Sequence, residues 1–207
     1  MAVRKIYLAF LGLLLGWTLA GQDGTLINIQ VAAGLRDAEG VVGWMQPGSP
    51  FNSENPRSLV FQFLASRDCY LYALALPDRS SEAVVLWPDV SNPEIMRAKA
   101  GRTISLDFNL SEMPALERSG TLAVLVFSKP PLKFHASLSK ARPDLARVER
   151  EIREYQRENS RFAHSASDDL VLIAGTLRDA AGEVRGLETD IHSFWAGMYE
   201  WHTSSTD

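Results

Sequence analysis

The sequence predicts a mainly β protein, an antiparallel sheet or β-sandwich with one amphipathic helix packed on it. Short apolar runs recur between residues 25 and 203, separated by Gly, Pro, Asn and Asp. Only residues 143–159 show apolar positions spaced by three and four. The chain has 207 residues and one cysteine, so its core must stabilise it without an internal disulfide. We therefore expect a single β-rich domain over residues 21–207.

Residues 1–20 have the pattern of a secretory signal. Arg4 and Lys5 precede a fourteen-residue apolar stretch, and small residues at 18–20 offer a cleavage site after Ala20. A membrane-spanning helix needs about 20 apolar residues, so a retained anchor is the weaker alternative. The only cysteine is Cys69, far from the cleavage site, which disfavours a lipoprotein. We expect a periplasmic or secreted protein with no stable membrane span after cleavage.

The charge of the processed chain argues against nucleic acid as a partner. Without residues 1–20, 19 Lys and Arg residues remain against 25 Asp and Glu residues, a net charge of −6. A nucleic-acid binder needs a basic patch to neutralise phosphates. No polybasic run is present that would hold the chain on anionic lipid.

The first strands are predicted to form a hairpin. Residues 25–32 alternate as a half-buried strand does, and a polar turn at residues 37–40 leads into a second short run. Residues 46–57 contain three prolines, which predicts a loop.

The strands between residues 58 and 131 are predicted to form a meander that is the central sheet. Residues 58–66 and 69–76 are apolar on nearly both faces, and we expect Arg67 and Asp68 to link them as a hairpin. Cys69 is expected to be a small buried residue. Further strands are predicted at residues 83–88, at 103–108 with one wet face, and at 122–128, with a possible helical turn around Ile95.

The predicted helix at residues 143–159 has a narrow apolar stripe and charged flanks. Leu145, Val148, Ile152 and Tyr155 form the stripe, and oppositely charged residues four apart lie beside it. The stripe lasts about three turns, short for a coiled coil. We expect it to pack on the protein's own sheet, with a partner helix as the alternative.

The C-terminal region is predicted to add a strand at residues 170–177 and a long or interrupted strand at 184–203 that returns along it. A helix at residues 191–201 is the competing interpretation. Trp195, Tyr199 and Trp201 would share one face of a strand. That face fits either core packing or a recognition surface, because both are rich in Trp and Tyr.

No motif in the sequence predicts catalysis or a bound cofactor. The chain lacks the G-x-S-x-G nucleophile motif and both common phosphate-binding glycine motifs. The four histidines, His135, His164, His192 and His202, form no close pair with metal-ligand spacing. We therefore predict no catalytic, cofactor-binding or metal-binding residues, and a protein that is not an enzyme.

Three short motifs in order resemble the bacterial family known as domain of unknown function 4384. They are VLWPD at residues 85–89, AGR at 100–102 and LVFSKP at 125–130, within a matching span of residues 58–131. The chain departs from the family pattern with Trp87 in place of a Phe or Tyr and Cys69 in place of a Gly. The resemblance implies a small β-rich module of bacterial envelope or signalling proteins, without established catalytic residues.

We thus expect an exported, non-enzymatic module that binds a protein or a cell-envelope component. One alternative is an envelope hydrolase with a site built from sequence-distant residues, and another is a subunit of an oligomeric assembly that uses the helix at 143–159. The loops at residues 47–56 and 88–99 and the C-terminal aromatics are the predicted contact surface. The predicted contact residues are Trp44, Phe51, Trp87, Trp195, Tyr199 and Trp201.

Overall fold

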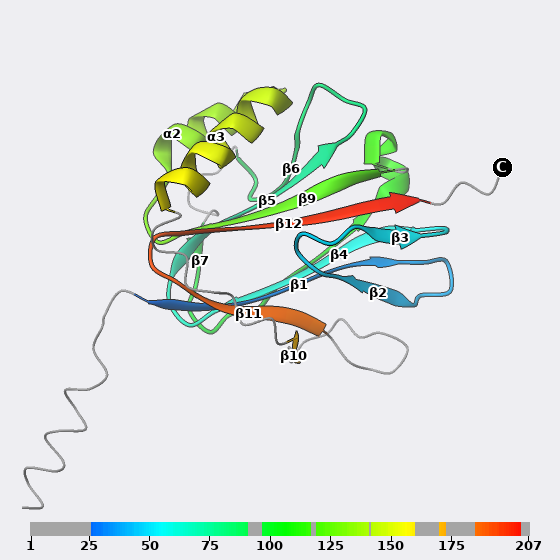
Figure 1. Cartoon of the computed structure of the whole chain (residues 1–207), viewed down its shortest axis with the longest axis horizontal. Coiled ribbons are helices and arrows are strands. Elements are labelled where there is room, and N and C mark those ends of the chain that lie inside the picture. Colours follow the sequence, from blue (N-terminus) through cyan, green and yellow to red (C-terminus); the bar gives the residue numbers. More distant parts are fainter. Residues whose placement is uncertain are drawn as a thin grey trace, which may run out of the picture.

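The chain folds as a β-sandwich with two helices on the outer face of one sheet (Figure 1). The computed structural model describes residues 26–90, 97–116, 119–140, 142–159, 170–172 and 185–203. Within these residues, strands form two six-stranded sheets. The predicted fold class is confirmed, and of the two predicted architectures the sandwich is the one adopted. The predicted signal at residues 1–20 lies outside the described residues.

The first sheet contains the N-terminal strands, with the order β10-β11-β1-β4-β8 and β2 beside β1. All its neighbouring strands are antiparallel, and β1 and β2 form the predicted hairpin. The wet face predicted for β8 is confirmed, because its residues alternate between half-buried and exposed. The strands are β1 (Ile27–Arg36), β2 (Val42–Met45), β4 (Ser58–Ala65), β8 (Ile104–Asn109), β10 (Leu170–Leu172) and β11 (Arg185–Ile191).

The second sheet has the order β3-β12-β9-β5-β6, with β7 also beside β5. Its pairs are antiparallel except β3, which runs parallel to the end of β12. The strands are β3 (Phe51–Ser53), β5 (Cys69–Pro77), β6 (Val84–Trp87), β7 (Arg97–Ala98), β9 (Ser119–Phe127) and β12 (Phe194–Thr203). Two short 3-10 helices, Leu110–Glu112 and Pro114–Leu116, connect β8 towards β9.

The main core lies between the two sheets and is built from alternate residues of the central strands. Leu59, Phe61 and Phe63 of β4 and Leu71, Ala73 and Ala75 of β5 are fully buried there. The other residues of β5, including Tyr72 and Leu74, face a second core beneath the helices. Both faces of β5 are therefore covered, as its nearly continuous apolar sequence predicts.

The second core lies between the second sheet and two helices, α2 (Leu132–Leu138) and α3 (Leu145–Asn159). The Asp144 carboxylate accepts a hydrogen bond from the Arg147 backbone N–H at 2.7 Å and so caps the start of α3. Val148 and Ile152 of α3 are buried against the sheet. The predicted helix and its packing are confirmed, and the stripe needed for the oligomer alternative is used within the chain. The shorter helix α2 was not predicted from the sequence.

Interlocked aromatic rings fill one end of the second core. Tyr72 meets Phe127 and Phe134 edge-to-face, with ring centroids 5.9 and 5.4 Å apart. Tyr155 of α3 packs edge-on to Phe127 at 5.1 Å and beside Phe194 at 5.5 Å. Such pairs add about 0.5–1.5 kcal/mol each beyond the area they bury, so they fix the helices on this sheet.

The predicted hairpin between residues 58–66 and 69–76 is wrong. β4 already has β1 and β8 as neighbours, so β5 crosses to the other sheet, where it pairs with β9 and β6. The crossing is held by polar contacts, since the Asp68 carboxylate accepts from the Ala100 backbone N–H at 2.8 Å and pairs with Arg97 at 2.7 Å. The hydrogen bond from Ala100 and the nearby cations hold the Asp68 pKa below its ordinary value. The segment 58–131 is thus divided between two sheets and is not one central sheet.

Two further expectations change at the ends of the second sheet. The loop predicted over residues 46–57 contains β3, which forms because the C-terminal end of β12 lies beside it. Residues 185–203 are two strands and not a helix. Of these, β11 returns along β10 as predicted, while β12 crosses to the second sheet. The predicted turn around Ile95 and residues 173–177 of the predicted strand lie outside the described residues.

Cys69 is fully buried in the main core, as predicted. Burial raises the pKa of its thiol from 9.0 to about 12, and the Asp68 carboxylate adds to the increase. A raised pKa in the folded state stabilises the fold below pH 9, and this contribution is lost as the pH rises from 9 towards 12.

We expect the free energy of unfolding to fall as the pH rises above 9, and to fall less steeply in a Cys69→Ala variant. Urea titrations of both proteins at pH values between 9 and about 10 isolate the thiol in the difference between them, because the tyrosines, which begin to ionise in the unfolded chain over this range, are the same in both. Equal slopes for the two proteins would show that the thiol is not the group responsible.

Candidate functional site

Two of the predicted contact residues, Tyr199 and Trp201, are core residues. Both point into the main core from β12, and Trp201 is 0% exposed. The Trp201 indole lies over Gly120, where an added Cβ would sit 3.1 Å from two ring atoms. The Trp201 Nε1–H donates to the backbone oxygen of Leu116 at 3.4 Å. In this conformation neither side chain is open to a partner.

Trp195 and Trp87 are half-buried at the border of the same core. Trp195 folds over Gly197, where a Cβ would lie 2.3 Å from a ring carbon. The indole N–H of Trp87 and the hydroxyl of Tyr199 are buried with no hydrogen-bond partner. Burial raises the Tyr199 pKa well above its ordinary value, so the hydroxyl stays protonated.

Trp44 and Phe51 are half-buried on β2 and β3. Trp44 packs on the outer face of the first sheet with Val42 and Val60, while the Phe51 ring lies over Gly43. The six predicted contact residues are therefore divided between the sandwich interior and the outer face of the first sheet. They do not form one surface.

The polar side chains around α2 have structural partners. The Tyr72 hydroxyl and His135 Nδ1 are 3.2 Å apart, and burial raises the Tyr72 pKa. Ser137 of α2 donates to the Glu151 carboxylate of α3 at 2.8 Å. The first contact holds α2 on the second sheet, and the second holds α2 against α3. Among the described residues, no three His, Cys, Asp or Glu side chains lie close enough to hold a metal ion.

A groove of about 400 Å³ runs between α3 and the outer face of the second sheet, and we call it the helix groove. Leu76 of β5, Thr121 of β9 and Met198 of β12 form its floor. Thr121 is paired directly with both Leu76 and Glu200, so these three residues form one row across three hydrogen-bonded strands, and Met198 lies two residues from Glu200 along β12. Glu149, Ile152, Arg153 and Gln156 of α3 form its wall.

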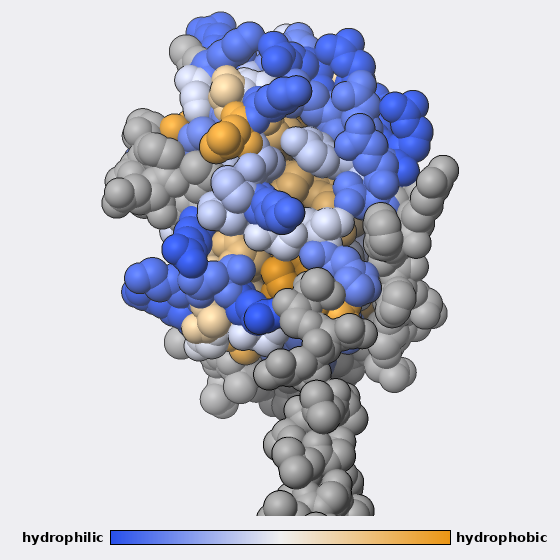
Figure 2. Space-filling view, turned by 90° about the vertical axis from the view of Figure 1, so that its left-hand side faces the viewer, coloured by the Kyte–Doolittle hydropathy of each residue, from blue (hydrophilic) through white to orange (hydrophobic). Residues whose placement is uncertain are grey.

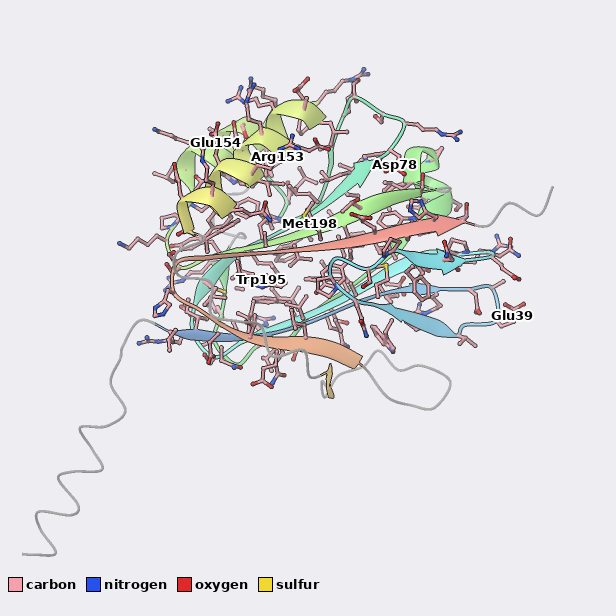
Figure 3. All side chains as sticks on the ribbon, in the orientation of Figure 1. Glu39, Asp78, Arg153, Glu154, Trp195 and Met198 are labelled. Atoms are coloured by element: carbon pink, nitrogen blue, oxygen red, sulfur yellow. The ribbon has the colours of Figure 1, made fainter. Side chains whose placement is uncertain are left out.

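Three carboxylates and one guanidinium surround the helix groove, those of Asp78, Glu149, Glu200 and Arg153. Arg153 forms an ion pair with Glu149 at 3.3 Å. Asp78 and Glu200 therefore have no ion-pair partner among the described residues. Figure 3 places Met198 beneath α3, Arg153 on that helix and Asp78 beyond the end of β5. This site was not predicted from the sequence because four elements distant in the sequence build it.

A second groove, of about 530 Å³, lies between α2 and α3. Glu151, Glu154 and Glu158 line it together with Arg147 and Lys133. Arg147 donates to Glu151 at 2.8 Å. The charged side chains here sum to −1, against −2 in the helix groove, and Glu151 also holds α2 against α3 through Ser137.

The surface beside these grooves is mainly hydrophilic. At the end of the sandwich on the left of Figure 1, hydrophobic residues show as small areas separated by hydrophilic ones (Figure 2). Among the described residues, only Val41 and Leu132 are exposed large hydrophobic residues. Such a surface favours recognition by charge and shape over a broad apolar contact.

The described helices include none with the length and apolar character needed to cross a bilayer. Comparison of the chain with models of known families, with curated proteins and with solved structures finds no match. The resemblance to the domain of unknown function 4384 family therefore stays a prediction.

Proposed function

We propose that the chain is an exported, non-enzymatic module that binds a protein or a cell-envelope component in the helix groove. The observation that supports this most directly is the construction of that groove, an open site of about 400 Å³ on a floor of three paired strands. Its size is within the range of about 300–1,000 Å³ typical of ligand pockets. Its floor is formed before any partner arrives, so binding needs little ordering of the backbone.

The other polar side chains near the helices have structural partners within the chain, which supports a binding role over a catalytic one. His135 contacts Tyr72, Ser137 contacts Glu151, and Cys69 is a buried thiol with a raised pKa. A hydrolytic nucleophile needs an adjacent base and access to substrate, and Cys69 lacks that access. Export is the role expected of residues 1–20, and the proposed family resemblance fits an envelope module.

Site-specific photocrosslinking in the native cell tests this proposal. A photoreactive residue in place of Gln156 lies in the helix groove, whereas one in place of Glu39 lies in the exposed β1–β2 turn, far from α3 (Figure 3). We expect a discrete adduct from position 156 and none from position 39. Probes at Trp44 and Phe51 test the contact surface predicted from the sequence. If none of the four positions yields an adduct, the proposed binding function is wrong.

A further inference from the structure

We infer that the helix groove binds a lysine or arginine side chain, flanked by aliphatic residues, from a segment of a partner protein. The inference rests on the proposed binding function and specifies its partner chemistry. It follows from the charges at the rim of the groove and from the apolar character of its floor.

The charge at the rim is unbalanced. Arg153 is paired with Glu149, so the remaining charge is that of Asp78 and Glu200. These two residues approach the groove from opposite sides of β9, because β5 and β12 pair with the two edges of that strand. A cation placed between them would gain two attractive interactions, whereas an anion would be repelled by both.

The floor and wall suit the stem of a basic side chain. Leu76, Met198 and Ile152 line the groove with aliphatic groups, and Met198 is the most exposed of the three. Lysine and arginine side chains bury their methylene stems along apolar surface and keep the charged end in a polar setting. Small inorganic cations have no such stem, and no carboxylate trio close enough for a metal occurs among the described residues.

A protein segment fits the groove better than an anionic envelope component does. Phospholipid head groups and acidic glycans would bring negative charge to an acidic rim, on a chain whose net charge after processing is −6. The groove holds one long side chain and part of its neighbour, and it is too small for the face of a folded domain. A short exposed segment of a partner is therefore the occupant.

Selection from a library of short random peptides on the purified exported chain tests the inference. We expect the enriched peptides to carry Lys or Arg beside Leu, Ile or Met. Binding of one synthetic enriched peptide should weaken by about fivefold in Asp78→Asn and again in Glu200→Gln, the upper range for an exposed ion pair. It should also weaken as salt rises from about 50 to about 500 mM, because screening shortens the reach of these charges.

Glu39→Gln is the matched control, because it removes the same charge from an exposed turn outside the groove. Its binding should equal that of the unchanged protein. All three variants should keep the same melting temperature, since neither Asp78 nor Glu200 has an ion-pair partner among the described residues.

Several results would overturn the inference: no enrichment, enriched peptides without basic residues, or unchanged binding in the Asp78→Asn, Glu200→Gln double variant. Free spermidine that binds as tightly as the peptide would also overturn the choice of a protein segment. These failures are distinct from failure of the proposed function. If position 156 still yields a crosslinked partner, the groove binds a different chemistry, and if no position does, both proposals fail.

Discussion

Trp201→Ala is expected to lower the free energy of unfolding by about 3–5 kcal/mol, the usual cost of deleting a large aromatic side chain from a core. Trp201 is 0% exposed and lies in the main core over Gly120. The change removes the packing of the indole and leaves the Leu116 backbone oxygen without its donor. Urea denaturation followed by circular dichroism at neutral pH measures the loss.

Trp201→Phe is the control for that experiment. It keeps an aromatic ring over Gly120 but removes the indole N–H, so its cost should be clearly smaller than that of alanine. A loss below about 1 kcal/mol for Trp201→Ala would mean that β12 does not contribute its aromatic face to the core.

Tyr199→Phe is expected to stabilise the protein by about 1–3 kcal/mol, the penalty of a buried polar group that has no hydrogen-bond partner. The Tyr199 hydroxyl is buried in the main core and unpaired, and its removal leaves the ring packing intact. Chemical denaturation at neutral pH should show a higher midpoint with an unchanged slope.

Tyr72→Phe is a matched comparison, because it removes a hydroxyl that contacts His135 at 3.2 Å. It should destabilise the protein by about 0.5–1.5 kcal/mol, the net value of one hydrogen bond. If Tyr199→Phe destabilises the protein as Tyr72→Phe does, the Tyr199 hydroxyl has a partner in solution and the premise is wrong.

The strands were predictable where the apolar pattern is local, but their assignment to sheets was not. β4 and β5 both read as strands covered on two faces, and both are. The short link at residues 66–68 fits a hairpin as well as a crossing between sheets. The choice depends on β1 and β8, which occupy both edges of β4 and come from distant parts of the chain.

The elements that were missed depend on tertiary contacts. α2 has seven residues, too few for a clear period, and it is held by Phe134 packing in the second core. β3 has three residues in a proline-rich segment and forms by parallel pairing with residues 201–203. Helix α3 was predictable because Pro143 and Asp144 signal its start just before it and its fifteen residues carry a regular stripe.

The helix groove was not predictable for a similar reason. The aromatic residues near the C-terminus were predicted to be part of the contact surface, yet Tyr199 and Trp201 face the core. Met198 and Glu200 alternate with them on β12 and face the groove. One strand thus supplies both the core and the site, and only the partner strands decide which set points outward.

The pairing of β11 and β12 with strands made much earlier has a consequence for the order of folding. β12 pairs with β9 over nine residues, and β11, just before it, pairs with β1 at the other end of the chain. Both sheets therefore stay incomplete until residues 185–203 have been made and have joined them. A chain cut short before Phe194 would expose the long apolar edge of β9, a template for aggregation.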